Sequence, residues 1–310
     1  MKCIKCGGKA AVEVPRAHSA FCPEHFIEYF DRQVERAIKD FAMFTPEDRI
    51  AVAVSGGKDS LALWDVLLRK GYDTLGIHIA LGIGDYSDLS RQKTEAFAAQ
   101  RNAPLKVIDL EERYHFGIDE LPRRIRRAPC SGCGLTKRYL LNRIAYEEGC
   151  TVLATGHNLD DEASTLLGNV LWWQEPYLAH QSPALPSTHP KLVKRVKPFY
   201  RLTEKETASY AVLRGIDYIV DECPMSRDAQ TILLKQALNL IERKSPGAKH
   251  NFVFGFLEKA RPLFASAPQA QDYRECVQCG QPTTSESEVC AFCHLLERLE
   301  GRPLLPVVGL

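Results

Sequence analysis

The stretch Arg49-Ile-Ala-Val-Ala-Val-Ser55-Gly56-Gly57-Lys58-Asp59-Ser60 decides the fold. Its apolar first half predicts a buried strand. After the glycine turn, apolar residues recur at helical spacing, and Gly71 is expected to end that helix. These apolar residues are Leu61, Trp64, Leu67 and Leu68. A buried strand that leads through a glycine turn into an amphipathic helix is typical of an α/β fold.

The same alternation of short apolar runs and amphipathic stretches continues toward the C-terminus. It predicts an α/β fold with a doubly wound parallel sheet that helices cover on both faces. Further strands are expected at 73–81, 105–110, 151–155 and 216–220. Helices are expected at 90–100, 135–148, 160–170, 203–214 and 229–243. Residues 173–189 have no periodicity and are predicted to form a long loop over a site.

Composition shifts divide the chain into four parts. We expect an N-terminal zinc finger at 1–30, a catalytic domain at 31–220, a helical C-terminal part of that domain at 221–270, and a zinc ribbon at 271–310. The zinc finger leads into a helix predicted at 26–44, and a linker rich in Pro, Ala and Gln at 265–271 precedes the ribbon.

The composition is that of an ordinary globular protein, with 45% hydrophobic and 25% charged residues among 310. We expect a cytoplasmic protein without membrane spans, because apolar runs of about 20 residues and a signal peptide are both absent from the sequence. The formal net charge of +1 does not by itself indicate nucleic-acid binding. Basic residues do cluster, in the segments 123–127 and 191–201, and each cluster alone is also compatible with a solvated surface.

The glycine turn has the chemistry of a pyrophosphate cradle. Gly56 and Gly57 allow the backbone to approach a phosphate closely, and the following helix offers unpaired N–H groups at its start. Further donors come from Ser55, Lys58 and Ser60. The turn matches neither the Walker A pattern nor the dinucleotide pattern GxGxxG. It therefore predicts a pyrophosphate-binding turn of another kind, with Asp59 as an acidic neighbour.

Eleven cysteines are unusual for a cytoplasmic chain, where metal ligation or catalysis is a better explanation than disulfides. Two groups have the spacing of structural zinc sites, each with four protein ligands and therefore closed to substrate. The first group is Cys3, Cys6, Cys22 and His25. The second is Cys276, Cys279, Cys290 and Cys293. The alternative for either group is reactive surface thiols.

Three further cysteines lie within the predicted catalytic domain and form a candidate third metal site. Cys130 and Cys133 are separated by two residues, and Cys223 precedes a proline. Three thiolates would hold a [4Fe–4S] cluster with one iron left open. A redox pair or a persulfide carrier is the alternative for Cys130 and Cys133. Cys150 begins an apolar strand and is expected to be a core residue.

A second polar turn, Gly156-His-Asn-Leu-Asp160-Asp161-Glu-Ala163, follows the predicted strand at 151–155 and opens a helix. It is similar to the GHNxDDxA segment of tRNA-thiolating enzymes. This resemblance implies that backbone groups at Gly156 contact the nucleotide and that Asp161 binds magnesium or positions the target base. Asp160 is alternatively the cap of the helix.

These segments resemble those of a known enzyme family. Residues 55–60 are similar to the SGGxDS signature of the PP-loop ATP pyrophosphatases, which have an adenine nucleotide alpha hydrolase-like fold. The order of the motifs resembles that of the two-thiouridine synthetases of the TtcA/TtuA family along essentially the whole chain. These motifs are the terminal cysteine groups, the PP-loop, the segments 130–139 and 156–163, and Glu222-Cys223-Pro224.

The resemblance implies site roles and a reaction. Asp59 would help to hold magnesium and pyrophosphate, the backbone near Ala53 and Ile79 would contact adenine, and Lys137 would stabilise negative charge. ATP would adenylate the 2-oxygen of the T-loop 5-methyluridine of tRNA, and sulfur would replace it. Cys223 before proline favours the [4Fe–4S] cluster.

The resemblance also implies partners, and it leaves rivals open. The partners are tRNA, a small ubiquitin-like sulfur carrier with a C-terminal thiocarboxylate, and a second copy of the chain. The arginines at 123–127 would lie where the tRNA backbone approaches. The rivals are a wobble-uridine tRNA thiolase, an iron-free ATP-pyrophosphatase ligase and a non-enzymatic zinc-ribbon RNA-binding protein.

Overall fold

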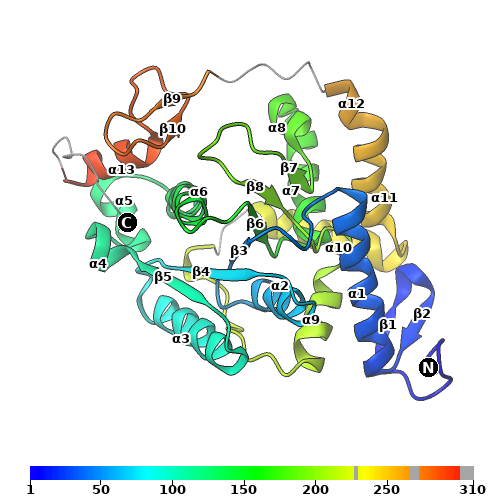
Figure 1. The fold of residues 1–310 in the computed structure, drawn as a ribbon. Coiled ribbons are helices and arrows are strands. Elements are labelled where there is room, and N and C mark those ends of the chain that lie inside the picture. The colour runs from blue at the N-terminus through cyan, green and yellow to red at the C-terminus, as the bar shows by residue number, and fades with distance from the viewer. Residues whose placement is uncertain (227–229, 265–271, 301–310) are drawn as a thin grey trace.

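A six-stranded sheet forms the centre of the computed structural model, which describes residues 1–226, 230–264 and 272–300 (Figure 1). The strand order is β5-β4-β3-β6-β8-β7. Five strands are parallel: β3 (Ile50–Ala53), β4 (Thr74–Ala80), β5 (Leu105–Asp109), β6 (Val152–Thr155) and β8 (Lys194–Val196). The edge strand β7 (Ala184–Leu185) pairs antiparallel with β8. From β3 the chain builds outward to β5 and then returns to β6, so β3 and β6 flank the switch point where α/β sheets bind ligands.

Helices cover both faces of this sheet, as predicted (Figure 1). On one face lie α2 (Lys58–Arg69), α3 (Gly84–Arg101) and α9 (Glu204–Leu213). On the other face lie α6 (Pro129–Glu147) and α7 (Leu159–Leu171). The remaining helices are α1 (Pro23–Asp40), α4 (Leu110–Tyr114), α5 (Leu121–Ile125), α8 (Glu175–His180), α10 (Gln230–Lys244), α11 (Ala248–Gly255), α12 (Arg261–Phe264) and α13 (Ala291–Glu300). Two small hairpins complete the fold, β1 (Val12–Val14) with β2 (Ser19–Phe21), and β9 (Arg274–Glu275) with β10 (Pro282–Thr283).

Alternate residues of the strands feed two separate cores, as expected for strands buried on both faces. Ile50 and Val52 join the core that contains α2 and the N-terminal hairpin. Ala51 joins the opposite core, which contains α6 and the C-terminal cysteines. Each end of the chain is therefore built into a different face of the sheet. Among the described helices, none is both long and apolar enough to cross a membrane.

The predicted strand at 216–220 is wrong. This segment is irregular, and the Ile219 amide donates to the Gly56 carbonyl at 2.9 Å. The segment therefore lies beside the nucleotide turn, where it supports the loop and does not extend the sheet.

Several predicted boundaries also differ. The long loop at 173–189 contains α8 and β7, because Glu175-Pro176 starts a helical turn and Ala184 pairs with the edge of β8. Helix α6 begins at Pro129, six residues before the predicted start, since a proline suits the first helical turn. Helix α1 ends at Asp40 and not at the predicted residue 44, because Ala42 takes a left-handed conformation that ends the helical turn. The predicted linker at 265–271 lies outside the described residues.

Candidate functional site

The glycine turn at the end of β3 is held in a fixed shape by its own hydroxyl groups. Ser60 Oγ accepts from the Ser55 amide at 3.0 Å and donates to the Gly57 carbonyl at 3.0 Å. Ser90 of α3 donates to the Ser55 carbonyl at 2.6 Å. Gly56 has φ +74°, and a Cβ there would lie 2.5 Å from the Ser90 carbonyl oxygen. The turn therefore requires glycine, and its amides at the start of α2 face the switch point of the sheet.

The second polar turn, at the end of β6, lies directly against the first. A Cβ on Gly156 would lie 2.8 Å from the carbonyl carbon of Asp59 and 2.9 Å from the Ser60 amide. Asn158 caps α7 by accepting from the Asp161 amide at 3.2 Å, and its side-chain amide donates to Asp59 at 3.3 Å. The two loops that are predicted to contact the nucleotide thus form one surface. A side chain at position 156 would push the loops apart, so this position requires glycine.

The structure assigns the capping role differently from the sequence-based alternative. Asn158, and not Asp160, is the N-cap of α7, and Asp161 completes the capping box. Asp160 instead accepts from the Glu204 amide at 2.9 Å and forms a buried ion pair with Lys249. Asp160 is therefore occupied in joining α7, α9 and α11.

Five charged side chains surround the two turns. Lys58 Nζ lies 3.0 Å from Asp59 and 2.8 Å from Glu204, and Lys235 Nζ lies 2.6 Å from Asp161. Burial would raise the pKa of Glu204, but its ion pairs with Lys58 and Lys235 outweigh burial and lower it. Burial likewise opposes the charge of Lys58, yet Asp59 and Glu204 raise its pKa.

Asp59 is the exception in this group, because burial raises its pKa even though Lys58 lies beside it. Its Oδ1 also accepts from the hydroxyl of Thr207. Asp59 is half-buried, and a carboxylate that is incompletely neutralised in such a position is a suitable oxygen ligand for a divalent cation. The arrangement therefore fits the predicted magnesium role of Asp59, with Asp161 on the facing loop.

Sequence reasoning missed three members of this polar group: Glu204, Thr207 and Lys235. Glu204 and Thr207 lie on the first turn of α9, and Lys235 lies on α10. A signal was present for α9, because Thr203 and Glu206 form a capping box. That pattern fixes where α9 begins, but only the packing of α9 on α2 brings it to the nucleotide turn.

The residues predicted to contact adenine lie at the ends of neighbouring strands. Ala53 is the last residue of β3 and pairs with Ile77 of β4 and Thr155 of β6. Ile79 is buried near the end of β4. Both lie at the carboxyl edge of the sheet, on the same side as the nucleotide turn.

The three central cysteines come from two segments that face each other. Cys130 and Cys133 lie on the first two turns of α6, and Cys223 precedes a short 3-10 helix, Pro224–Ser226. Cys130 Sγ donates to the Met225 carbonyl at 3.4 Å. Burial raises the pKa of Cys223, and the neighbouring thiols of Cys133 and Cys130 act in the same direction.

These three sulfurs are more widely spaced than ligands of one metal ion. Within the described residues, only the two terminal groups bring three or more ligand atoms within 4.8 Å of one another. Thiolates on a single tetrahedral zinc stand about 3.8 Å apart, given a Zn–S bond of about 2.3 Å. A four-iron cluster is larger than one ion and needs wider spacing. The donor set thus fits a cluster better than a third zinc.

Lys137 is a charged residue on the same helix as Cys130 and Cys133. It is half-buried on α6, one turn beyond Cys133. Its charge helps to lower the pKa of buried His78, after the larger effect of burial, and His78 Nδ1 lies 2.9 Å from the Val54 carbonyl. The same charge acts on Cys223. One lysine therefore acts on both halves of the site.

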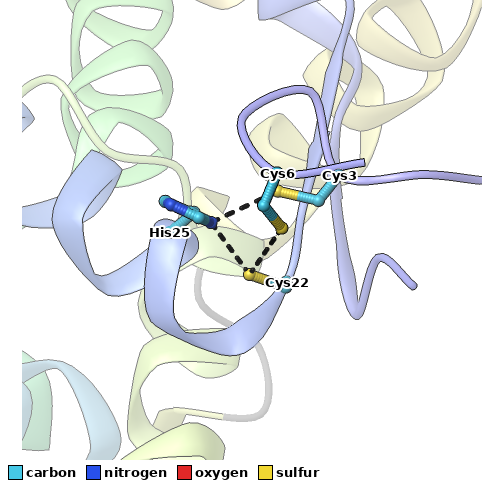
Figure 2. A group of neighbouring side chains, drawn as sticks. All are labelled: Cys3, Cys6, Cys22 and His25. Carbon is cyan, nitrogen blue, oxygen red and sulfur yellow. Dashed lines mark hydrogen bonds between the residues drawn. The ribbon is translucent and has the colours of Figure 1, made fainter. Parts of the chain in front are cut away.

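The two terminal groups are assembled as the spacing predicted. In the N-terminal cluster, His25 Nδ1 lies 3.0 Å from Cys22 Sγ and 3.5 Å from Cys3 Sγ (Figure 2). In the C-terminal cluster, the sulfurs of Cys279 and Cys290 are 3.7 Å apart. The members are Cys3, Cys6, Cys22 and His25 in the N-terminal cluster, and Cys276, Cys279, Cys290 and Cys293 in the C-terminal cluster. Both donor sets fit one tetrahedral metal ion each.

The predicted basic surface at 123–127 is only partly free for tRNA. Arg124 donates to Glu120 at 2.9 Å and to the Leu299 carbonyl at 3.0 Å, so it fixes α13 to α5. Arg127 donates to Ser131 at 3.2 Å. Arg123 and Arg126 are exposed.

Comparison with known proteins places this site in context. Residues 28–239 match the family model described as PP-loop domain, and residues 2–27 match 2-thiouridine synthetase TtuA, N-terminal LIM domain. The chain is 52% identical to tRNA-5-methyluridine(54) 2-sulfurtransferase of Thermus thermophilus, over 99% of this chain and 95% of the relative. It is 32% identical to cytoplasmic tRNA 2-thiolation protein 1 of Chlamydomonas reinhardtii, over 98% and 87% of the two chains. A solved structure, the U34-tRNA thiolase NcsA of Methanococcus maripaludis with its [4Fe–4S] cluster, superimposes with TM-score 0.80 at 27% identity, over 98% of this chain and 97% of that one.

Proposed function

This chain belongs to the PP-loop family and, within it, to the tRNA 2-sulfurtransferases, and on this premise we propose that it uses ATP to exchange the 2-oxygen of the T-loop 5-methyluridine of tRNA for sulfur. One observation carries the proposal: the charge of Lys137 on α6 acts both on His78, whose ring contacts the Val54 carbonyl just before the nucleotide turn, and on Cys223. A base held beside Lys137 would reach both an activating nucleotide and a sulfur source.

The first part of the reaction uses the two polar turns. The base 2-oxygen attacks the α-phosphorus of ATP, and pyrophosphate leaves toward the amides at the start of α2. Asp59 and Asp161 would hold magnesium, which would offset the charge of the phosphates. The uracil oxygen, a very poor leaving group by itself, becomes a good one once it carries AMP.

The second part uses α6. Cys130, Cys133 and Cys223 would hold a [4Fe–4S] cluster, which supplies an iron without a protein ligand for the incoming sulfur. Lys137 stabilises the negative charge that develops on the phosphate or on the base oxygen. Sulfide-level sulfur attacks C2 of the activated base and forms the C–S bond, and AMP then departs with the original oxygen. The [4Fe–4S] cluster in the similar NcsA structure supports this assignment.

We propose the same partners and location as the resemblance implies. The proposed partners are tRNA, a ubiquitin-like sulfur carrier with a C-terminal thiocarboxylate, and a second copy of the chain in a homodimer. We also propose two structural zinc ions and a cytoplasmic location. The donor sets of the terminal clusters support zinc, and the name of the Chlamydomonas relative supports the location.

The target base is tested by mapping sulfur in tRNA. Anaerobically purified protein is incubated with tRNA that lacks 2-thiouridine, together with magnesium–ATP and sulfide, and the digested tRNA is analysed by mass spectrometry. Sulfur on the T-loop 5-methyluridine, with one AMP released per sulfur, is the expected result. Sulfur in the anticodon would instead identify a wobble-uridine thiolase.

The iron assignment is tested by metal analysis of matched cysteine variants. Cys130→Ala and Cys223→Ala should lose the iron and sulfide found in the wild-type protein. Cys150→Ala is the matched control and should keep both, because Cys150 is buried beyond the C-terminal end of α6, whereas Cys130 and Cys133 lie near the start of that helix. Retained iron in either of the first two variants would contradict the assignment of the three cysteine ligands. A colourless wild-type protein that contains zinc alone would instead favour an iron-free ligase.

A further inference from the structure

Lys235 forms a bridge that the proposed chemistry has not used. It lies on α10, far along the chain from both polar turns, and its side chain is 26% exposed. Its ammonium group contacts Asp161 at 2.6 Å and Glu204 at 3.3 Å. The other carboxylate oxygen of Glu204 accepts from Lys58 at 2.8 Å. One carboxylate therefore holds two ammonium groups, and one of these belongs to the nucleotide turn.

The ion pairs between these lysines and carboxylates are suited to being exchanged for contacts with a charged ligand. Two lysines placed this close repel each other unless anions lie between them. Here the anions are Asp59, Asp161 and Glu204, three carboxylates for two lysines.

Magnesium–ATP offers each of these groups a better partner. Magnesium prefers carboxylate oxygens, and Asp59 and Asp161 lie on facing loops. Phosphate oxygens bind lysine as strong charge-assisted acceptors. When the metal takes the carboxylates, both lysines are free to turn to the phosphates without the loss of a counter-charge.

We infer that Lys235 is a second phosphate-binding lysine of the ATP site. When magnesium–ATP binds, its ammonium group breaks its contacts with Asp161 and Glu204 and binds the β- and γ-phosphates. This inference rests on the proposed function. It adds to the nucleotide turn a contact from α10, which the motif at 55–60 does not contain. A purely structural role, in which Lys235 only ties α10 to α7 and α9, is the competing explanation.

Equilibrium binding separates the two explanations. Affinities for AMP and for a non-hydrolysable magnesium–ATP analogue are measured by calorimetry for wild-type protein, Lys235→Met and Lys235→Arg. Lys235→Met should weaken analogue binding by about 10- to 100-fold and change AMP binding by less than about twofold, because AMP lacks the β- and γ-phosphates. Lys235→Arg keeps the charge and should recover most of the affinity.

Lys244→Met is the matched control, since Lys244 is exposed at the end of the same helix. It should bind both nucleotides as the wild type does. Analogue affinity of Lys235→Met within twofold of wild type would overturn the inference, and so would equal weakening of AMP and analogue binding. Failure of the wild-type protein itself to bind the analogue would instead count against the proposed function.

Discussion

The N-terminal cluster is linked to the helix beside the nucleotide turn through a buried ion pair as well as aromatic packing, whereas the C-terminal cluster is linked to the cysteine-bearing helix through aromatic packing. Arg16, in the 3-10 turn between β1 and β2, contacts Glu206 of α9 at 2.9 Å, and Tyr29 of α1 donates to the same carboxylate at 2.8 Å. Glu206 caps α9, whose first turn also carries Glu204 and Thr207. The N-terminal cluster thus positions the groups that hold Lys58 and Asp59.

The C-terminal cluster contacts α6 through aromatic rings. Phe292, between two of its cysteines, stacks on Tyr139 of α6 with centroids 4.2 Å apart, and meets Tyr114 edge-on at 5.3 Å. Cys276 and Cys293 are buried in the same core as α6. The two clusters look alike in sequence, yet one supports the nucleotide half of the site and the other the sulfur half.

Removal of a metal should give the largest effect. Cys293→Ser and Cys22→Ser each remove one buried thiolate, and a structural zinc contributes about 10–16 kcal/mol of apparent binding energy. Each variant should lose one equivalent of zinc and melt at a lower temperature. Zinc content and thermal unfolding measure both effects.

The site of the damage should differ between these two variants. Cys293→Ser should lose iron and keep nucleotide affinity within about threefold, and Cys22→Ser should do the reverse. Equal loss of iron and nucleotide affinity in both variants would contradict the division of roles.

Loss of the buried charge pair should rank second. Glu206→Gln leaves Arg16 buried without its counter-ion, which costs about 3–5 kcal/mol when one partner of a buried pair is removed. Denaturant unfolding should show this loss, and magnesium–ATP affinity should fall with iron content unchanged. The matched control is Glu148→Gln, which breaks a surface pair with Lys106 and should cost less than about 1 kcal/mol.

Loss of an aromatic stack should give the smallest effect. Phe292→Leu keeps an apolar side chain but loses stacking on Tyr139, a contact worth about 0.5–1.5 kcal/mol. We expect faster loss of iron in air and slower sulfur transfer, with unchanged nucleotide binding. Phe21→Leu removes a comparable stack on Tyr29, with centroids 5.0 Å apart, and should affect nucleotide binding only. If both variants change iron loss and nucleotide binding to the same extent, the two clusters do not support different halves of the site.

The predictions from sequence were most successful where chemistry is local. The family implied by the motif order is confirmed, as is the doubly wound sheet, because strand, turn and helix signals of 49–71 lie next to one another in the chain. The terminal clusters were predictable for the same reason, since pairs of ligands two residues apart share one turn. The strand expected at 216–220 was wrong because an apolar run does not reveal which edge it will meet.

The sequence alone determined the nucleotide turn, the two metal-ligand groups and the alternation that builds a parallel sheet, because each depends on neighbouring residues. Only the tertiary structure decided that Glu204 and Lys235 reach the charged groups beside the nucleotide turn and that the charge of Lys137 acts on both His78 and Cys223. It also decided that each terminal cluster supports a different half of the site. These contacts join segments far apart in the chain, so they depend on how helices pack across the sheet, which local pattern does not specify.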